Sequence, residues 1–494
     1  MVPIKKRIST ILHSLVSKIN KNIAWLIGLN VVIALSQFIV YALINNNLGK
    51  EILGVWSLVV AVTSIGQISS FGFSNSLVRY LPEMLLKNQK DDIEKILGTI
   101  NFSNFFLTLP ILVLLYFPSI QYSGYLLNPE QLLIFKSVIP LSIAGLFINN
   151  LFAVYSFLLD AMQKYYLRSI VQITGWIFFL LISVVLIPLY GLRGVAIAFV
   201  VQNILQFVII ISLVSNQGVL QKTYPVYFDK KFFRHIFSFG LKSQYISILV
   251  IFFDPLVKFF ITKNLGLSAT ANYELSNKIV VQARNLLVST NQVIIPKIVL
   301  HNTAGTAGSY FTEVSHKNIF FSVSIGLLVL LFSPLVVYLF SNSYDSNLMQ
   351  CIIIINLGWV CNMITSVHYY CCIGLDKIGQ LVVYHFILSV TVIGLYLLFE
   401  HYLPWKSLNF AVPTVALFFG SIYNSYALSK KINTAFVWLR SGIFLYFIFV
   451  SFIFLSIHYI HATTITYLFI PVSFLPYIFW ISREFKMNRL FKPL

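Results

Sequence analysis

The sequence predicts an all-α membrane protein whose chain crosses the bilayer many times. Of its 494 residues, 58% are hydrophobic and only 10% are charged, whereas a soluble domain carries about 25% charged residues. About fourteen segments remain apolar over the ~20 residues that a helix needs to cross a hydrocarbon core. Lipid offers no partner to open backbone groups, so these segments are predicted to be helices.

The predicted spans follow one another along almost the whole chain. We expect them near residues 23–44, 54–77, 97–117, 132–158, 168–189, 191–214, 238–262, 271–296, 318–340, 348–373, 379–399, 409–428, 441–458 and 464–482. Their even number places both termini on the same side of the membrane.

The basic residues decide the orientation of the chain. The formal net charge is +19, from 34 Lys+Arg against 15 Asp+Glu. Most of these residues fall in loops on one side, whereas the opposite loops hold Lys50, Arg193, Lys263 and Lys406. The positive-inside rule therefore predicts that both termini lie in the cytoplasm. Because the basic residues are distributed according to membrane orientation, the positive net charge does not indicate a nucleic-acid partner.

The chain divides into predicted parts at its longest cytoplasmic connection. Residues 1–22 repeat apolar side chains at helical spacing opposite lysines, which predicts an amphipathic helix on the cytoplasmic leaflet. We expect an N-lobe of six spans at 23–214, a linker at 215–237 and a C-lobe of six spans at 238–430. The last two spans and a basic tail take up 431–494.

A weak internal repeat supports two lobes of equal topology. Asn47-Leu48-Gly49 follows the first span, with Trp56 seven residues after the glycine. Asn264-Leu265-Gly266 follows the seventh span, with Tyr273 at the same distance. Six spans per copy give both copies the same orientation, which predicts parallel repeats about an axis along the membrane normal.

Charged residues inside predicted spans are the most informative feature. They are Lys242, Asp254, Lys258, Glu274, Lys278 and Arg284. A charge in hydrocarbon is expensive, so such residues face a cavity, pair with one another or handle a substrate. Lys242 lies close to the inner surface, where a lysine can snorkel to water.

Two pairs of these charges are spaced to share a helix face. Asp254 and Lys258 are four residues apart, as are Glu274 and Lys278. A rise of 1.5 Å per residue gives the two pairs overlapping depths, so Asp254 can pair with Lys278 and Lys258 with Glu274. Pro255 removes a backbone donor and predicts a kink beside Asp254.

Two interpretations of these residues remain open. In one, they only neutralise each other and pack two helices. In the other, Arg284, Lys278 and Lys258 line a cationic cavity for an anionic group such as a pyrophosphate. Asp254 and Glu274 would then serve gating or ion coupling.

Polar residues also recur on the first two spans. Asn30, Gln37 and Tyr41 follow i, i+7, i+11, and Gln67 belongs to a similar series on the second span. Such side chains suit sugar hydroxyls and sugar faces, and equally suit hydrogen bonds between helices.

The sequence offers no sign of an enzyme, a metal site or a cofactor. Its loops are short and its acidic residues are scattered, and no phosphate-binding glycine loop is present. The four cysteines share one apolar segment and are read as small buried side chains.

Several stretches resemble a known family. Gly54-Val55-Trp56-Ser57-Leu58, Ser76-Leu77-Val78-Arg79-Tyr80-Leu81-Pro82-Glu83 and Gly191-Leu192-Arg193-Gly194 are similar to bacterial polysaccharide flippases that export O-antigen and capsule repeat units. The same signatures are shared in part with lipid II flippases and multidrug exporters of that superfamily. The resemblance implies a V-shaped transporter of two lobes with a central cationic cavity and no cofactor. In that family basic residues of the first, second, seventh and eighth helices line the cavity. Here the first two helices lack an interior charge, which shifts weight to Lys258, Lys278 and Arg284.

The resemblance therefore implies a flippase of the bacterial inner (cytoplasmic) membrane, which moves undecaprenyl-pyrophosphate-linked oligosaccharide across that membrane by alternating access. The expected partners are this lipid-linked substrate, membrane lipids, and the glycan polymerase and chain-length machinery. The alternatives are a cation-coupled multidrug exporter and a membrane-embedded glycan polymerase or ligase.

Overall fold

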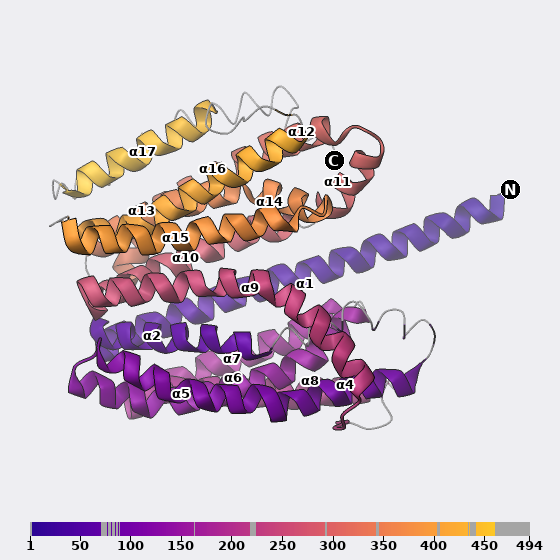
Figure 1. Ribbon diagram of the computed structural model, residues 1–494, viewed down its shortest axis with the longest axis horizontal. Helices are drawn as coiled ribbons and strands as arrows, with labels where there is room; N and C mark the ends of the chain where they lie inside the picture. Colours follow the sequence, from indigo (N-terminus) through magenta and orange to yellow (C-terminus); the bar gives the residue numbers. More distant parts are fainter. Residues whose placement is uncertain are drawn as a thin grey trace. The chain divides into compact units, whose positions relative to one another are not determined.

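The computed structural model consists of helices and their connections, with no strand in the part of the chain that it describes (Figure 1). The described residues are 2–70, 77, 81, 84, 87, 89–162, 164–217, 224–291, 294–341, 345–402, 406–432, 434 and 441–459. The predicted last span at 464–482, most of the stretch 71–83 and the side chains of residues 1–24, including those of the predicted amphipathic helix, lie outside them, as does the side chain of Lys242.

The chain forms two compact units, Met1–Pro255 and Leu256–Leu494. Unit 1 contains α1 (Val2–Leu48), α2 (Lys50–Gly66), η1 (Gln67–Ser70), α4 (Lys90–Ser103), η2 (Asn104–Thr108), α5 (Leu109–Gly124), α6 (Pro129–Ala161), α7 (Tyr165–Tyr190) and α8 (Leu192–Ser215). Helix α9 (Lys230–Leu265) begins in unit 1 and ends in unit 2. Unit 2 continues with α10 (Leu267–Asn291), α11 (Ile294–Thr303), α12 (Ala307–Ser341), α13 (Ser346–Ile364), α14 (Ser366–Gly374), α15 (Ile378–Tyr402), η3 (Lys406–Ala411), α16 (Val412–Ile432) and α17 (Gly442–Tyr459).

Local sequence signals explain where several helices begin. Asn128 caps α6, because its side chain accepts a hydrogen bond from the Gln131 amide while Gln131 bonds back to the Asn128 backbone. Pro129 occupies the first position of that helix, where its missing N–H costs nothing. Asp345 caps α13 by accepting from the Leu348 amide at 3.0 Å.

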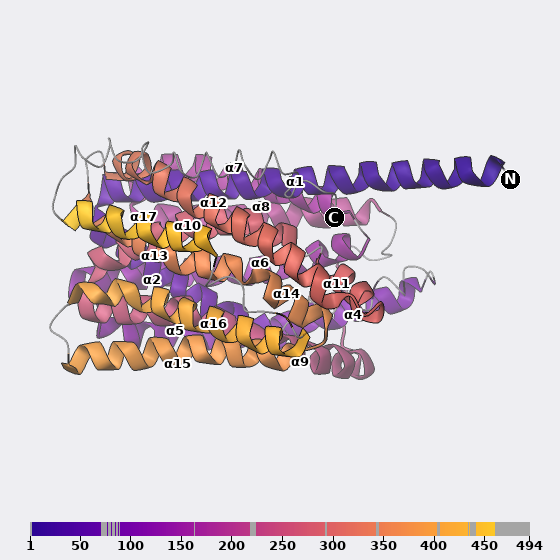
Figure 2. The ribbon, with the colours of Figure 1, turned by 90° about the horizontal axis from the view of Figure 1, so that it is seen from above.

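The amphipathic stretch 1–22 and the first span form one helix. α1 runs without a break from Val2 to Leu48 and is drawn as a straight rod (Figures 1 and 2). The sequence between Ile19 and Trp25 contains no glycine or proline that would end a helix there. The expected surface helix is therefore continuous with the first span.

Nine helices in the described part of the chain are long and apolar enough to cross a membrane. They agree with the first six predicted spans and with those near 318–340, 348–373 and 379–399. The predicted number of fourteen is not confirmed. The spans predicted at 238–262, 271–296, 409–428 and 441–458 overlap the helices α9, α10, α16 and α17.

Unit 2 is organised around α13. This helix packs against α10, α12, α16 and α17, while α15 lies along α16 (Figures 1 and 2). The candidate span Ser346–Gly374 has 72% of its most apolar window buried, against 28–56% for the other eight. A helix so enclosed does not face lipid, so it can carry polar side chains toward its neighbours.

Part of the predicted linker is fixed to unit 1. The backbone carbonyl of Pro225 accepts a hydrogen bond from the Asn101 side chain at 2.9 Å, and the Tyr227 amide donates to Gly98 at 3.4 Å. Tyr224 stacks near Tyr155, with ring centroids 6.0 Å apart. Burial raises the pKa of Tyr224 to about 12, so its hydroxyl remains neutral at physiological pH.

Candidate functional site: a charged cluster on α10

The candidate site is built on α10, the most polar long helix of unit 2. Its sequence places Glu274, Lys278 and Arg284 within 25 residues. Several of its polar side chains are buried, including Thr270, Asn272, Glu274, Ser276 and Asn277. Hydrocarbon does not tolerate such a helix, so its stability depends on polar partners from the surrounding helices.

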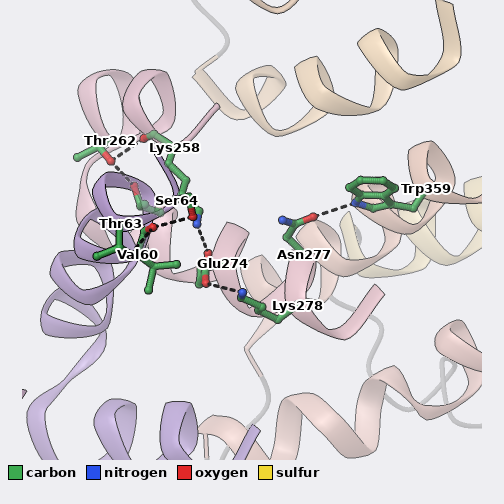
Figure 3. Close-up of polar contacts among 10 residues, drawn as sticks. Val60, Thr63, Ser64, Lys258, Thr262, Glu274, Asn277, Lys278 and Trp359 are labelled. Carbon is green, nitrogen blue, oxygen red and sulfur yellow. Dashed lines mark hydrogen bonds and ion pairs between the residues drawn. The ribbon is translucent and has the colours of Figure 1, made fainter. Parts of the chain in front are cut away.

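Glu274 lies between two lysines (Figure 3). Its Oε2 is 2.6 Å from the Nζ of Lys258 on α9, and both side chains are almost completely buried. Its Oε1 is 3.8 Å from the Nζ of Lys278, one turn further along α10. Lys278 keeps 31% of its side chain exposed. Two ammonium groups and one carboxylate leave this cluster, here called the charged triad, with one net positive charge.

The buried Lys258–Glu274 pair depends on the attraction between its two charges. Each ion loses its hydration when it is buried, and their mutual attraction compensates only while both are present. The Thr262 hydroxyl donates to the Lys258 carbonyl at 2.7 Å and lies 2.8 Å from the Thr270 hydroxyl, which links α9 to α10 beside the triad. Lys278 is the member of the triad that can reach a ligand without breaking this pair.

Arg284 occupies a separate position near the other end of α10. Ten residues after Glu274, it lies about 15 Å further along the helix axis. Its Nε donates to Asn362 Oδ1 at 2.6 Å, and its Nη1 donates to Asn285 Oδ1 at 3.3 Å. Among the described residues no carboxylate pairs with Arg284. Its remaining N–H groups have no described partner, so they are available to an anionic ligand.

Helix α13 holds the Arg284 guanidinium in place. The Arg284 Cζ lies 5.1 Å from the centre of the Trp359 ring, within cation–π range. Trp359 Nε1 donates to Asn277 Oδ1 at 2.8 Å, so the same indole is anchored to α10 (Figure 3). Asn362, three residues after Trp359, accepts from Arg284 and donates to the Tyr384 hydroxyl at 2.7 Å. These contacts fix the direction of the guanidinium before any ligand arrives.

The predicted site residues fall into three groups. Glu274 contacts both Lys258 and Lys278, whereas Arg284 lies further along α10 and bonds to Asn362 of α13. Asp254 lies in α9 on the unit 1 side of the division and is half-buried.

The residues predicted to face a sugar lie in unit 1. Asn30 and Gln37 on α1 are half-buried, Tyr41 is buried, and Gln67 is exposed at the start of η1. None of these positions tests a sugar contact, so that role stays a prediction.

Sequence reasoning missed the supports of Arg284 on α10, α13 and α15. Asn277, Trp359, Asn362 and Tyr384 have no charge, so a search for intramembrane charges passes over them. Trp359 and Asn362 are three residues apart and share a helix face, which is a weak signal that the sequence does contain.

The sequence matches a known protein family over more than half of its length. Residues 19–300 match the model of a family described as polysaccharide biosynthesis protein. An uncharacterized membrane protein of Methanocaldococcus jannaschii is 23% identical over 270 residues. That alignment covers 51% of this chain and 52% of the relative, so the chain spans about half the length of the curated relative that it matches.

Solved structures show the same fold at low sequence identity. The lipid II flippase MurJ superposes with a TM-score of 0.71 at 14% identity, covering 94% of this chain and 99% of MurJ. A multidrug-resistance MATE family transporter of the MOP superfamily gives a TM-score of 0.70 at 13% identity, covering 82% and 95%. Because the family model matches more than half of the chain, this multi-pass membrane protein belongs to the polysaccharide biosynthesis protein family.

Proposed function

We propose that this protein is a flippase for undecaprenyl-pyrophosphate-linked oligosaccharide repeat units of the O-antigen or capsule type. It moves them across the cytoplasmic membrane by alternating access, with both termini in the cytoplasm. The observation that carries the proposal is the net positive, largely buried set of side chains on α10, with Arg284 oriented and without a carboxylate partner among the described residues.

The chemistry of a pyrophosphate fits these groups. A guanidinium presents parallel N–H donors that match two oxygens of one phosphate, and Lys278 adds a compact charge from the same helix. Asn362 and Trp359 hold Arg284 in advance, so little rotamer entropy is lost when the anion binds. Lys258 contributes positive charge but remains committed to Glu274.

Family and fold support the transport part of the proposal. The chain belongs to a polysaccharide biosynthesis family, and its fold is shared with a lipid II flippase. We assign the triad of Lys258, Glu274 and Lys278 to gating, with Asp254 as a further ion-coupling group on α9. A glycan polymerase and chain-length machinery would act on the oligosaccharide after it has crossed.

Binding of undecaprenyl pyrophosphate to the protein in lipid nanodiscs tests the site. Arg284→Gln should weaken binding by about 10- to 100-fold, the equivalent of the 1.5–3 kcal/mol of a charge-assisted hydrogen bond. Lys278→Gln should have a smaller effect. Lys317→Gln is the matched control, because Lys317 pairs with the exposed Glu313 at 2.9 Å. Equal affinity in all four proteins would contradict the cationic site.

Cells lacking the gene test the transport assignment. Without this protein, surface glycan should be lost and its lipid-linked precursor should accumulate in the inner membrane. The Lys278→Gln/Arg284→Gln double variant, at normal protein levels, should fail to restore glycan display. Restoration by the double variant would remove the proposed role of these residues.

A drug exporter is the second candidate, because the fold is equally similar to a MATE family transporter. A site for cationic drugs requires a net acidic lining, whereas two lysines oppose one glutamate in the triad. Raised drug resistance on overexpression, with no change in surface glycan, would favour the exporter.

A further inference from the structure

His385 on α15 is a buried titratable group that the proposed function does not use. Its side chain is 7% exposed, and neither ring nitrogen has a hydrogen-bond partner among the described residues. An imidazole always carries at least one N–H, and a buried donor without an acceptor costs about 1–3 kcal/mol. A polar group kept at that cost inside a membrane protein indicates a functional role.

The ring of His385 contacts the rings of two tyrosines. Its centroid lies 4.8 Å from that of Tyr384 and 6.1 Å from that of Tyr369 on α14, both edge-on. Tyr384 accepts from Asn362, and Asn362 accepts from Arg284. The histidine is therefore joined to the anion-binding guanidinium through two intervening side chains.

Arg284 is the charged group at the end of this chain of contacts. The described titratable groups in contact with the ring are the phenols of Tyr369 and Tyr384, and Arg284 of α10 supplies the positive charge of this region. Helix α16 meets this region through Gly420, which packs against Tyr384 without bringing a charge. A fixed cation nearby opposes a second positive charge on His385, with little water to screen the two.

A bound pyrophosphate reverses this balance. It brings at least two negative charges to Arg284, so the field at His385 changes from repelling a proton to attracting one. We propose that His385 is a proton-binding site coupled to the anion at Arg284, so that the protein takes up one proton with each pyrophosphate that it binds. This inference rests on the proposed function.

The step involves no bond of the substrate. A proton comes from bulk water, is held on an imidazole nitrogen, and returns to water when the pyrophosphate leaves. The loaded site then carries one negative charge fewer, which lowers the cost of moving the anion through a medium of low dielectric. By linkage, a lower pH must tighten pyrophosphate binding to the same extent that pyrophosphate favours the proton.

Calorimetry measures this uptake directly. Undecaprenyl pyrophosphate is titrated into the full-length protein in nanodiscs, in two buffers of different ionisation enthalpy. At about pH 8 the probe is itself fully ionised, so the protons that are taken up belong to the protein. The wild type should take up close to one proton for each molecule bound. Its Kd should rise by up to ~10-fold for each unit by which the pH is raised. His385→Gln should take up almost none and bind with a flatter pH dependence.

The controls separate the two proposals. His316→Gln replaces an exposed histidine whose ring meets the Thr312 carbonyl, and it should behave as the wild type does. Proton uptake in His385→Gln equal to that of the wild type would overturn the inference. Binding of the probe to the wild type at about pH 8 without proton uptake would also overturn the inference. If the wild type and Arg284→Gln bind the probe equally tightly, the anion site at Arg284 is rejected, and the proposed function loses its main support.

Discussion

Helices α2 and α10 begin in the same way and differ in what they carry. Each follows a glycine with positive φ, 89° at Gly49 and 85° at Gly266. The glycine amide donates to the residue four positions earlier, and its carbonyl accepts from the residue four positions later, in both places. The aromatic residue seven positions on is buried in both, as Trp56 and as Tyr273.

Beyond this common start the two helices diverge. The charged residues of α2 are Lys50 and Glu51 in its first turn, whereas α10 carries Glu274, Lys278 and Arg284 along its length. The comparison teaches that a junction can be repeated for reasons of backbone geometry while charge is concentrated in one copy. Four sets of substitutions test it, from the largest expected effect to the smallest.

Removing the carboxylate of the triad should have the largest effect. Glu274→Gln removes the carboxylate that lies 2.6 Å from the buried Lys258 ammonium, which should destabilise the protein by about 3–5 kcal/mol. Chemical unfolding in detergent, followed by fluorescence, measures the loss. The matched change on α2 is Glu51→Gln, where an exposed carboxylate accepts from Gln131 at 2.8 Å. That variant should lose less than about 0.5 kcal/mol.

A double variant separates charge from packing in the triad. Lys258→Met/Glu274→Leu replaces both ions by apolar groups of similar size and should recover most of the stability lost in Glu274→Gln. If the double variant is as unstable as the single one, the cost arises from packing and not from an unpaired charge.

The two glycine junctions should respond alike. A Cβ at Gly49 or at Gly266 would meet no atom within 4 Å, so substitution is opposed only by the backbone conformation. Gly49→Ala and Gly266→Ala should each cost about 1–3 kcal/mol. If the losses of unfolding free energy in the two variants differ by more than about 1 kcal/mol, the two junctions are not structurally equivalent.

The indole N–H on α13 should have the smallest effect. Trp359→Phe keeps an aromatic face for Arg284 but removes the donor to Asn277, which should cost about 0.5–1.5 kcal/mol. Undecaprenyl pyrophosphate should bind about 2- to 10-fold more weakly. Trp176→Phe on α7, where the ring packs edge-on against Phe179, is the control and should bind normally. Unchanged affinity in Trp359→Phe would show that the hydrogen bond from Trp359 to Asn277 does not help to orient Arg284.

Some features of the site were predictable because they depend on a single helix. The four-residue spacing of Glu274 and Lys278 requires that both lie on one face, and the structure places them 3.8 Å apart. The 2.6 Å contact between Lys258 and Glu274 agrees with one of the two pairs that helix depth permits, whereas Lys278 pairs with Glu274 and not with Asp254. The roles of these residues in gating and in substrate binding stay predictions.

The sequence by itself determined the class of the molecule, because composition and hydrophobic length decide whether a chain is stable in lipid. It also located the charged helix, since charges in apolar segments stand out against their surroundings. The tertiary structure alone decided which charges are satisfied. α13 supplies Asn362 and Trp359 to Arg284, and α15 supplies the Tyr384 hydroxyl that accepts from Asn362. Such contacts join residues far apart in the chain, and no local spacing encodes them.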